Sequence, residues 1–214
     1  MRQEFHKHLD NLRDKIFIMS SKVAEELELA LKALNALDLD LAQQVIEADV
    51  AVNEMRARLE EECFALIATQ QPAAGDLRAI IAVMNMIVDL ERMGDQTKGI
   101  AKVIPHLMKD PKARLPELKD LGDMVGAMLH QGMTAYANDD VDLARQVVAQ
   151  DDEADKLYAQ ISTKIMRQMA QTEDTAKVEA SYKVLRAARE MERFGDLVTH
   201  IGERVIYKVT GQFS

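Results

Sequence analysis

The sequence has a single cysteine, no tryptophan, few aromatic residues and few residues that break helices. Cys63 has no partner within the 214 residues, so no internal disulfide can form, and a reducing compartment is the simpler setting. Aromatic residues make up 4%, with 9 glycines and 4 prolines, while Ala, Leu, Glu, Met, Gln and Lys predominate. These are helix formers, so the composition excludes an all-β fold.

The sequence also lacks a long apolar run and an excess of positive charge. Its longest apolar stretch, residues 79–88, is far shorter than the roughly 20 residues of a membrane-spanning helix, and the first residues hold no apolar signal core. Lys and Arg total 27 against 36 Asp and Glu, a net charge of −9. This balance argues against nucleic acid or anionic lipid as a partner held by charge, and it favours cations. We expect a soluble cytoplasmic protein.

Apolar residues recur at steps of three and four in six long segments, which is the period of one helix face. The segment DPKARLPEL, residues 110–118, is the one clear linker between them, and no strand candidate remains. The pattern predicts helices over about residues 5–37, 41–70, 76–104, 117–138, 140–170 and 173–209.

The last three predicted helices repeat the first three. The segment DLAQQVIEAD recurs 102 positions later as DLARQVVAQD, and ERMGD recurs 101 positions later as ERFGD. Chance does not produce both matches in the same order. We therefore predict an all-α fold of two tandem, internally duplicated three-helix bundles, residues 1–110 and 111–214, joined end to end, with antiparallel neighbouring helices.

Acidic side chains continue the apolar columns of the third and sixth predicted helices. Glu91 with Asp95, and Glu192 with Asp196, are each four residues apart and share a helix face beside the core stripe. Like charges in such a position are unfavourable unless a cation neutralises them. Arg189 precedes Asp196 in its column and is a rival partner for it.

The second and fifth predicted helices carry matching pairs beside their apolar stripes. Counted from the intervening turn, the pairs of each half reach about the same height in an antiparallel hairpin, so we expect them to meet. Each bundle is thus predicted to hold one carboxylate-rich metal site. The candidate ligands are Asp49, Asn53, Glu91, Asp95, Asp151, Asp155, Glu192 and Asp196.

Oxygen ligands favour Mg²⁺, Mn²⁺, Ca²⁺ or iron over zinc and leave the identity of the metal open. A ferritin-like di-iron enzyme requires Glu-x-x-His motifs, and none of the five histidines follows Asp or Glu by three residues. His200, four residues after Asp196, is either a further ligand or an ordinary surface residue. The simplest alternative to metal binding is that the acidic residues face water or pair with neighbouring cations, Glu91 with Lys98 for example.

No phosphate loop, Ser-His-Asp set or Cys-His set is present, so the sequence looks non-catalytic.

At residues 71–104 and 184–207, and in the paired segments 40–55 and 142–157, the chain resembles the PhoU family of bacterial phosphate-signalling proteins over essentially its whole length. The LERMGD and MERFGD cores are specific to it. The family's metal motif, an acidic residue followed four later by Asp, maps onto Glu91 with Asp95, Asp151 with Asp155 and Glu192 with Asp196, whereas Asp49 is followed by Asn53.

The resemblance implies a cytoplasmic, usually homodimeric regulator with multinuclear metal sites. It implies two partners, the ATPase subunit of a phosphate ABC transporter and a membrane sensor histidine kinase, and contact with the membrane only through them. As an adaptor between these two, such a protein negatively regulates the phosphate-starvation response. Two other classes stay open at this stage, a carboxylate-bridged metal enzyme such as a phosphatase or oxidase, and a purely structural helical scaffold.

Overall fold

The computed structural model describes residues 2–108, 110 and 115–212, and it is built from long antiparallel helices. Within these residues there is no strand, which confirms the all-α prediction. The helices are α1 (Arg2–Ala36), α2 (Leu39–Gln70), α3 (Ala74–Ala101), α4 (Ile104–Leu107), α5 (Glu117–Asn138), α6 (Val141–Ala170) and α7 (Thr175–Thr210).

The helices begin and end close to the residues that the sequence marks. The carboxylates of Asp38, Asp140 and Asp174 accept hydrogen bonds from backbone N–H groups in the first turns of α2, α6 and α7. Asp38 and Asp140 hold equivalent places in the repeat. The third helix ends at Ala101, earlier than predicted, and Pro105 instead lies in the first turn of the short helix α4.

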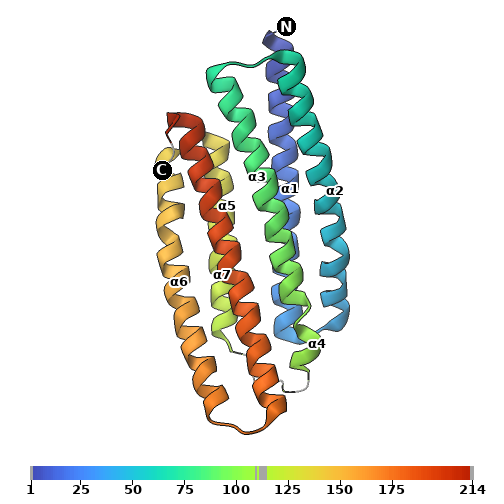
Figure 1. Ribbon diagram of the computed structural model, residues 1–214, viewed down its shortest axis with the longest axis vertical. Helices are drawn as coiled ribbons and strands as arrows, with labels where there is room; N and C mark the ends of the chain where they lie inside the picture. Colours follow the sequence, from blue (N-terminus) through green and yellow to red (C-terminus); the bar gives the residue numbers. More distant parts are fainter. Residues whose placement is uncertain (1, 109, 111–114, 213–214) are drawn as a thin grey trace.

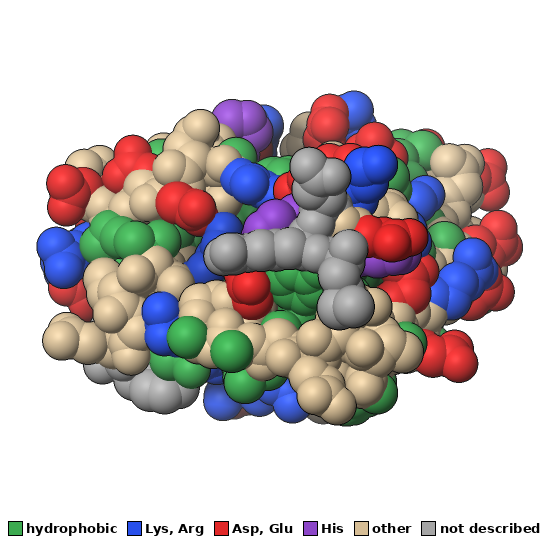
Figure 2. All heavy atoms as spheres, turned by 90° about the horizontal axis from the view of Figure 1, so that it is seen from above, with side chains coloured by type: hydrophobic (Ala, Val, Ile, Leu, Met, Phe, Trp, Pro, Cys, Tyr) green, Lys and Arg blue, Asp and Glu red, His purple; other side chains and the backbone are tan. Residues whose placement is uncertain are grey.

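The two three-helix bundles lie side by side, with α3 against α7 and α1 against α5 (Figure 1). The prediction that they are joined end to end is wrong. One continuous apolar core runs through both bundles, because α3 and α7 bury side chains toward their own bundle and also toward each other. Seen along the long axis, the molecule has an oblong outline rimmed by acidic and basic side chains (Figure 2).

Small residues let the central helices approach their neighbours closely. A Cβ added to Gly202 of α7 would lie 3.0 Å from the backbone oxygen of Ala144 in α6. One added to Gly99 of α3 would lie 2.9 Å from the carboxyl carbon of Glu190 in α7. These contacts fix α7 against both α6 and α3, and so hold the acidic faces of α6 and α7 in register.

Among the described helices, none combines the length and apolar composition required to cross a lipid bilayer. The outer helices α1, α2 and α6 instead have one buried apolar face and one charged face exposed to solvent, as expected for helices packed around a protein core.

Candidate metal centre

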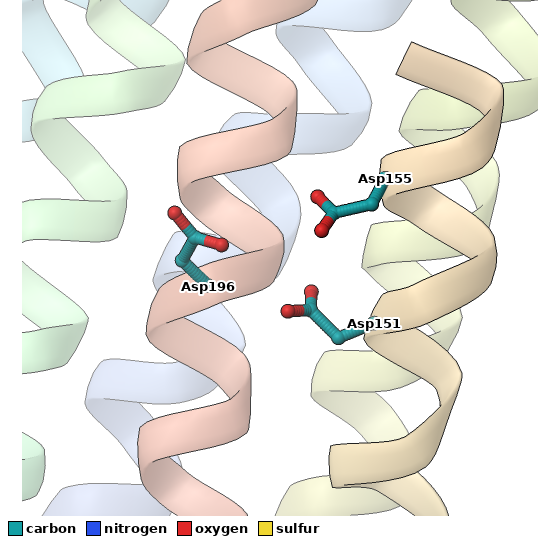
Figure 3. A group of neighbouring side chains, drawn as sticks. All are labelled: Asp151, Asp155 and Asp196. Atoms are coloured by element: carbon teal, nitrogen blue, oxygen red, sulfur yellow. The ribbon is translucent and has the colours of Figure 1, made fainter. Parts of the chain in front are cut away.

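Three aspartates converge where α6 faces α7 in the second bundle. Asp151 and Asp155 lie one helical turn apart on α6, and Asp196 projects toward them from α7 (Figure 3). One carboxylate oxygen of each lies within 4.8 Å of the other two. The pair on α6 therefore meets one member of the pair on α7, Asp196, whereas the count from the intervening turn had placed Glu192 level with Asp155.

Glu192 borders this aspartate cluster without joining it. It lies four residues before Asp196 on α7, is half-buried, and contributes no oxygen to the group within 4.8 Å. Burial raises the pKa of its carboxyl, and the negative charges of Asp196 and Asp155 raise it further. Glu192 thus interacts electrostatically with the cluster and is the remaining oxygen donor that the sequence predicted for this half.

The cluster carries an excess of negative charge, which His200 and Arg193 offset only in part. Burial, then Asp196, then Asp155 raise the pKa of Asp151 to about 6. Burial and Asp155 likewise raise the pKa of Asp196. Within the part of the chain that the structure describes, Arg189, the rival partner considered above, makes no ion pair with Asp196. Mutual repulsion in a partly dry site is the condition that a bound cation relieves.

His200 lies beside the cluster but pairs elsewhere. Its Nδ1 is 3.4 Å from Oδ1 of Asp89 on α3, and this hydrogen bond raises the pKa of the imidazole. His200 and Asp196 both line an open groove of about 460 Å³ between α3 and α7. Arg92 and Arg193 line the same groove, and the contact with Asp89 directs His200 toward α3.

In the first bundle the corresponding acidic side chains form ion pairs with residues of the chain itself. The ammonium of Lys98 lies 2.5 Å from Oδ2 of Asp49 and 2.6 Å from Oδ1 of Asp95. The guanidinium of Arg56 lies 2.9 Å from Oε1 of Glu91. The simplest alternative named above, pairing with neighbouring cations, therefore describes this half, although Lys98 pairs with the two aspartates and Arg56 with Glu91.

Asn53 is a second donor to Asp49 in this half, and the other oxygen of Asp49, Oδ1, is buried without a hydrogen-bond partner among the described residues. Its amide Nδ2 donates a hydrogen bond of 2.9 Å to Oδ2 of Asp49, the same oxygen that Lys98 contacts. The residue that departs from the family motif thus serves as a donor to Asp49. With a cation directed at one oxygen each of Glu91, Asp49 and Asp95, the chain itself neutralises this half, whereas the aspartate cluster of the second bundle has the arrangement that suits a metal ion.

A further carboxylate, Glu26 of α1, lies against Asp49 and is only 4% exposed. A Cβ added to Gly94 would lie 3.2 Å from Oδ1 of Asp49 and 3.4 Å from Oε2 of Glu26, so this glycine leaves room for both carboxylates. Burial, and then the charge of Asp49, raise the pKa of Glu26 to about 7. The sequence analysis missed Glu26, although it interrupts the buried column formed by Met19 and Ala33 at steps of seven.

The comparisons with known proteins agree on one family. The model of the PhoU domain matches residues 16–104 and again residues 118–205, once in each bundle. The phosphate-specific transport system accessory protein PhoU homolog of Pseudomonas putida is 35% identical over 212 residues, which cover 98% of this chain and 82% of that protein. The PhoU accessory protein of Escherichia coli K12 is 33% identical over 210 residues, covering 98% and 86%.

Two crystal structures show the same architecture. The phosphate transport system regulatory protein PhoU from Streptococcus pneumoniae superimposes with a TM-score of 0.92 at 30% identity, covering 98% of this chain and 99% of the other. PhoU from Pseudomonas aeruginosa also gives 0.92, at 32% identity, covering 97% and 100%. Sequence similarity over nearly the whole length and a shared duplicated fold together show that the chain belongs to the PhoU family.

Proposed function

We propose that the chain is a non-enzymatic regulatory accessory protein of phosphate transport. The observation that carries this proposal is the match to the PhoU domain in both bundles, together with full-length relatives named as accessory or regulatory proteins of the phosphate transport system. Because one fold can host several functions, the fold alone would not be sufficient.

The finer part of the proposal is an adaptor role. The protein would act in the cytoplasm as a homodimer, contact the ATPase subunit of a phosphate ABC transporter and a sensor histidine kinase, and keep the phosphate-starvation response off while phosphate is plentiful. The side-by-side bundles support this role, since they present two separate outer flanks. Exposed apolar side chains lie on both, Val50 and Phe64 on α2 and Met166 on α6.

The proposal includes a metal ion in the second bundle, with Mg, Mn or Fe as candidates. Asp151, Asp155 and Asp196 would hold it, with Glu192 at its border. The bound ion would supply positive charge. The chain's own contribution is to hold three carboxylate oxygens from two helices close together, so that binding ties α6 to α7.

Deleting the gene in its host tests the regulatory part. Expression of a phosphate-responsive reporter should become high in phosphate-rich medium and return to the basal level when the wild-type chain is supplied. Unchanged expression after deletion would contradict the proposal.

Complementation with a variant separates the metal site from the adaptor role. The Asp151→Asn, Asp196→Asn double variant tests whether regulation requires the cluster, and Asp142→Asn, at an exposed position on the first turn of α6, is the matched control. Elemental analysis of the purified proteins should show metal in the wild type and the control, and none in the double variant.

A further inference from the structure

The two halves of the repeat differ at the positions that supply cations to the first bundle. The register that aligns Glu91 with Glu192 places Lys98 at the position of Thr199. The register that aligns Asp49 with Asp151 places Arg56 at the position of Tyr158. Neither replacement carries positive charge, so the second bundle keeps the acidic residues without the cations that neutralise them in the first.

Lys98 occupies the place where a metal ion would have to bind in the first bundle. Its ammonium bridges Asp49 on α2 and Asp95 on α3, and it is flanked by Gly94, one helical turn earlier on the same helix. The side chain of Lys98 is 21% exposed and that of Asp49 only 3%, so the pair is largely withdrawn from water. Burial alone would lower the pKa of Lys98, but the hydrogen bonds to Asp49 and Asp95 outweigh it and raise the pKa above its ordinary value.

Two other oxygens of the first bundle are paired or buried. Arg56 pairs with Glu91, whose side chain is mostly buried. Oδ1 of Asp49 has no hydrogen-bond partner in the part of the chain that the structure describes, but it is buried against Gly94 and Glu26, away from the surface where Asp95 lies. A metal ion entering this site would have to displace the ammonium of Lys98 and leave that charge partly buried without its partners, which is strongly unfavourable.

We propose that Lys98, assisted by Arg56, is the resident cation of the first bundle and excludes from it the metal that the second bundle binds. Each chain then has one metal-binding half and one half that is neutralised by its own side chains. The inference rests on the proposed function only for the metal in the second bundle. The exclusion of metal from the first bundle is a separate claim about Lys98 and Arg56.

Mn²⁺ is a suitable probe, because it prefers oxygen ligands and its free and bound forms are distinguished by electron paramagnetic resonance. The test uses the full-length chain with the second bundle silenced by Asp155→Asn and Asp196→Asn. Two variants are made in this background. Lys98→Gln removes the charge but retains an N–H donor, and Lys98→Thr with Arg56→Tyr installs the residues found at the equivalent positions of the second bundle.

Lys15→Gln is the matched control, since it removes one lysine from another ion pair between helices, Lys15 with Glu62. We expect the silenced chain and the control to bind no Mn²⁺. Both Lys98 variants should bind about one Mn²⁺ per chain and lose it when Asp95→Asn is added. Circular dichroism establishes whether each variant is folded. If the variant with Lys98→Thr and Arg56→Tyr does not fold, the single substitution Lys98→Gln decides the result.

Two results would overturn the inference. In one, the silenced chain with Lys98 intact binds Mn²⁺ and loses it on Asp95→Asn. In the other, the folded Lys98 variants bind none. If the proposed metal site of the second bundle fails instead, the unmodified chain binds no Mn²⁺ in that bundle. The comparison of variants in the silenced background would still decide the role of Lys98.

Discussion

The two bundles of this protein share the same arrangement of three helices and the same acidic motif, yet they balance the charge of that motif in different ways. In the first bundle, Lys98 and Arg56 lie against the carboxylates of α2 and α3. In the second bundle, three aspartates of α6 and α7 face one another, and the pKa of Asp151 rises to about 6. Residues outside the acidic motif therefore determine whether a repeat neutralises its carboxylates with its own side chains or leaves them facing one another.

The first helix of each bundle adds a second difference. A Cβ built on Gly94 would meet Glu26 of α1, whereas a Cβ built on Gly195 would lie 3.2 Å from Cγ1 of Val125 in α5. The first bundle thus places a buried carboxylate where the second places a valine. When it is ionised, above about pH 7, this extra acid increases the negative charge around Asp49, which favours a cation supplied by the chain itself.

Removing Lys98 should give the largest effect on stability. Lys98→Met leaves Asp49 buried without its cation, so we expect the free energy of unfolding to fall by about 2–4 kcal/mol. Thr199→Met at the equivalent position of the second bundle separates no ion pair, and should cost less. Urea denaturation followed by circular dichroism measures both.

Lys15→Met provides the control for this comparison. It breaks a more exposed ion pair between α1 and α2, and such pairs contribute about 0–1 kcal/mol. Equal losses for Lys98→Met and Lys15→Met would show that Asp49 is not held in the fold by Lys98, and the contrast between the bundles would lose its energetic basis.

The sequence predicted the helices well because its signals for them are local. The helix expected over residues 117–138 is observed over those residues as α5, and Asp38 and Asp140 cap α2 and α6. The side-by-side arrangement was missed, since a pattern of period 3.6 reports that a helix is buried but not which helix covers it. The broad burial of α3, where Ala82, Val83 and Met86 follow one another closely, is the signal of a central helix.

The site was predicted in part for the same reason. Spacing along each helix placed Asp151 and Asp155 on one face, and the length of the hairpin brought the acidic pair of α7 to about their height, although Asp196 and not Glu192 completes the cluster. The pairing of Arg56 with Glu91 depends on how α2 is rotated against α3, and no local pattern specifies it. Arg56 also has Glu60 one turn away on its own helix, and the sequence gives no reason to choose between these partners.

Metal should stabilise the second bundle and have no effect on the first. At about 100 times its dissociation constant, a metal that binds only the folded state adds about 2.7 kcal/mol to the free energy of unfolding. We expect Mn²⁺ to raise the melting temperature of the wild type, and chelation to reverse the change. Asp196→Asn should abolish the shift and Asp95→Asn should preserve it. The reverse pattern would assign the metal to the first bundle.

The buried acid of the first bundle should make stability depend on pH. Burial raises the pKa of Glu26 from its ordinary 4.5 to about 7, so the folded state binds the proton more tightly than the unfolded state. This contribution to stability is complete below about pH 4.5 and is lost as the pH rises through about 7. Glu26→Gln should therefore stabilise the protein by about 1–2 kcal/mol at about pH 8, and have little effect at about pH 5.

Val125→Gln is the control for Glu26→Gln, because it places the same amide at the corresponding position of the second bundle without removing an acid. It should destabilise the protein by a similar amount at both pH values, since no titrating group is exchanged. A Glu26→Gln effect that does not change with pH would mean that Glu26 is ionised in the fold and neutralised by a neighbouring cation such as Lys22.

The smallest expected change in the free energy of unfolding distinguishes the two bundles best, because equivalent substitutions in the two bundles should change it in opposite directions. In metal-free buffer, Asp196→Asn removes one of three mutually repelling carboxylates and should stabilise the chain by about 0.5–1 kcal/mol. Asp95→Asn removes an exposed partner of Lys98, which keeps its contact with Asp49, and should destabilise by about 0–0.5 kcal/mol. Parallel urea denaturations with a chelator present measure the two differences. If both substitutions stabilise the protein, the carboxylates of the first bundle also repel one another, and Lys98 does not neutralise them.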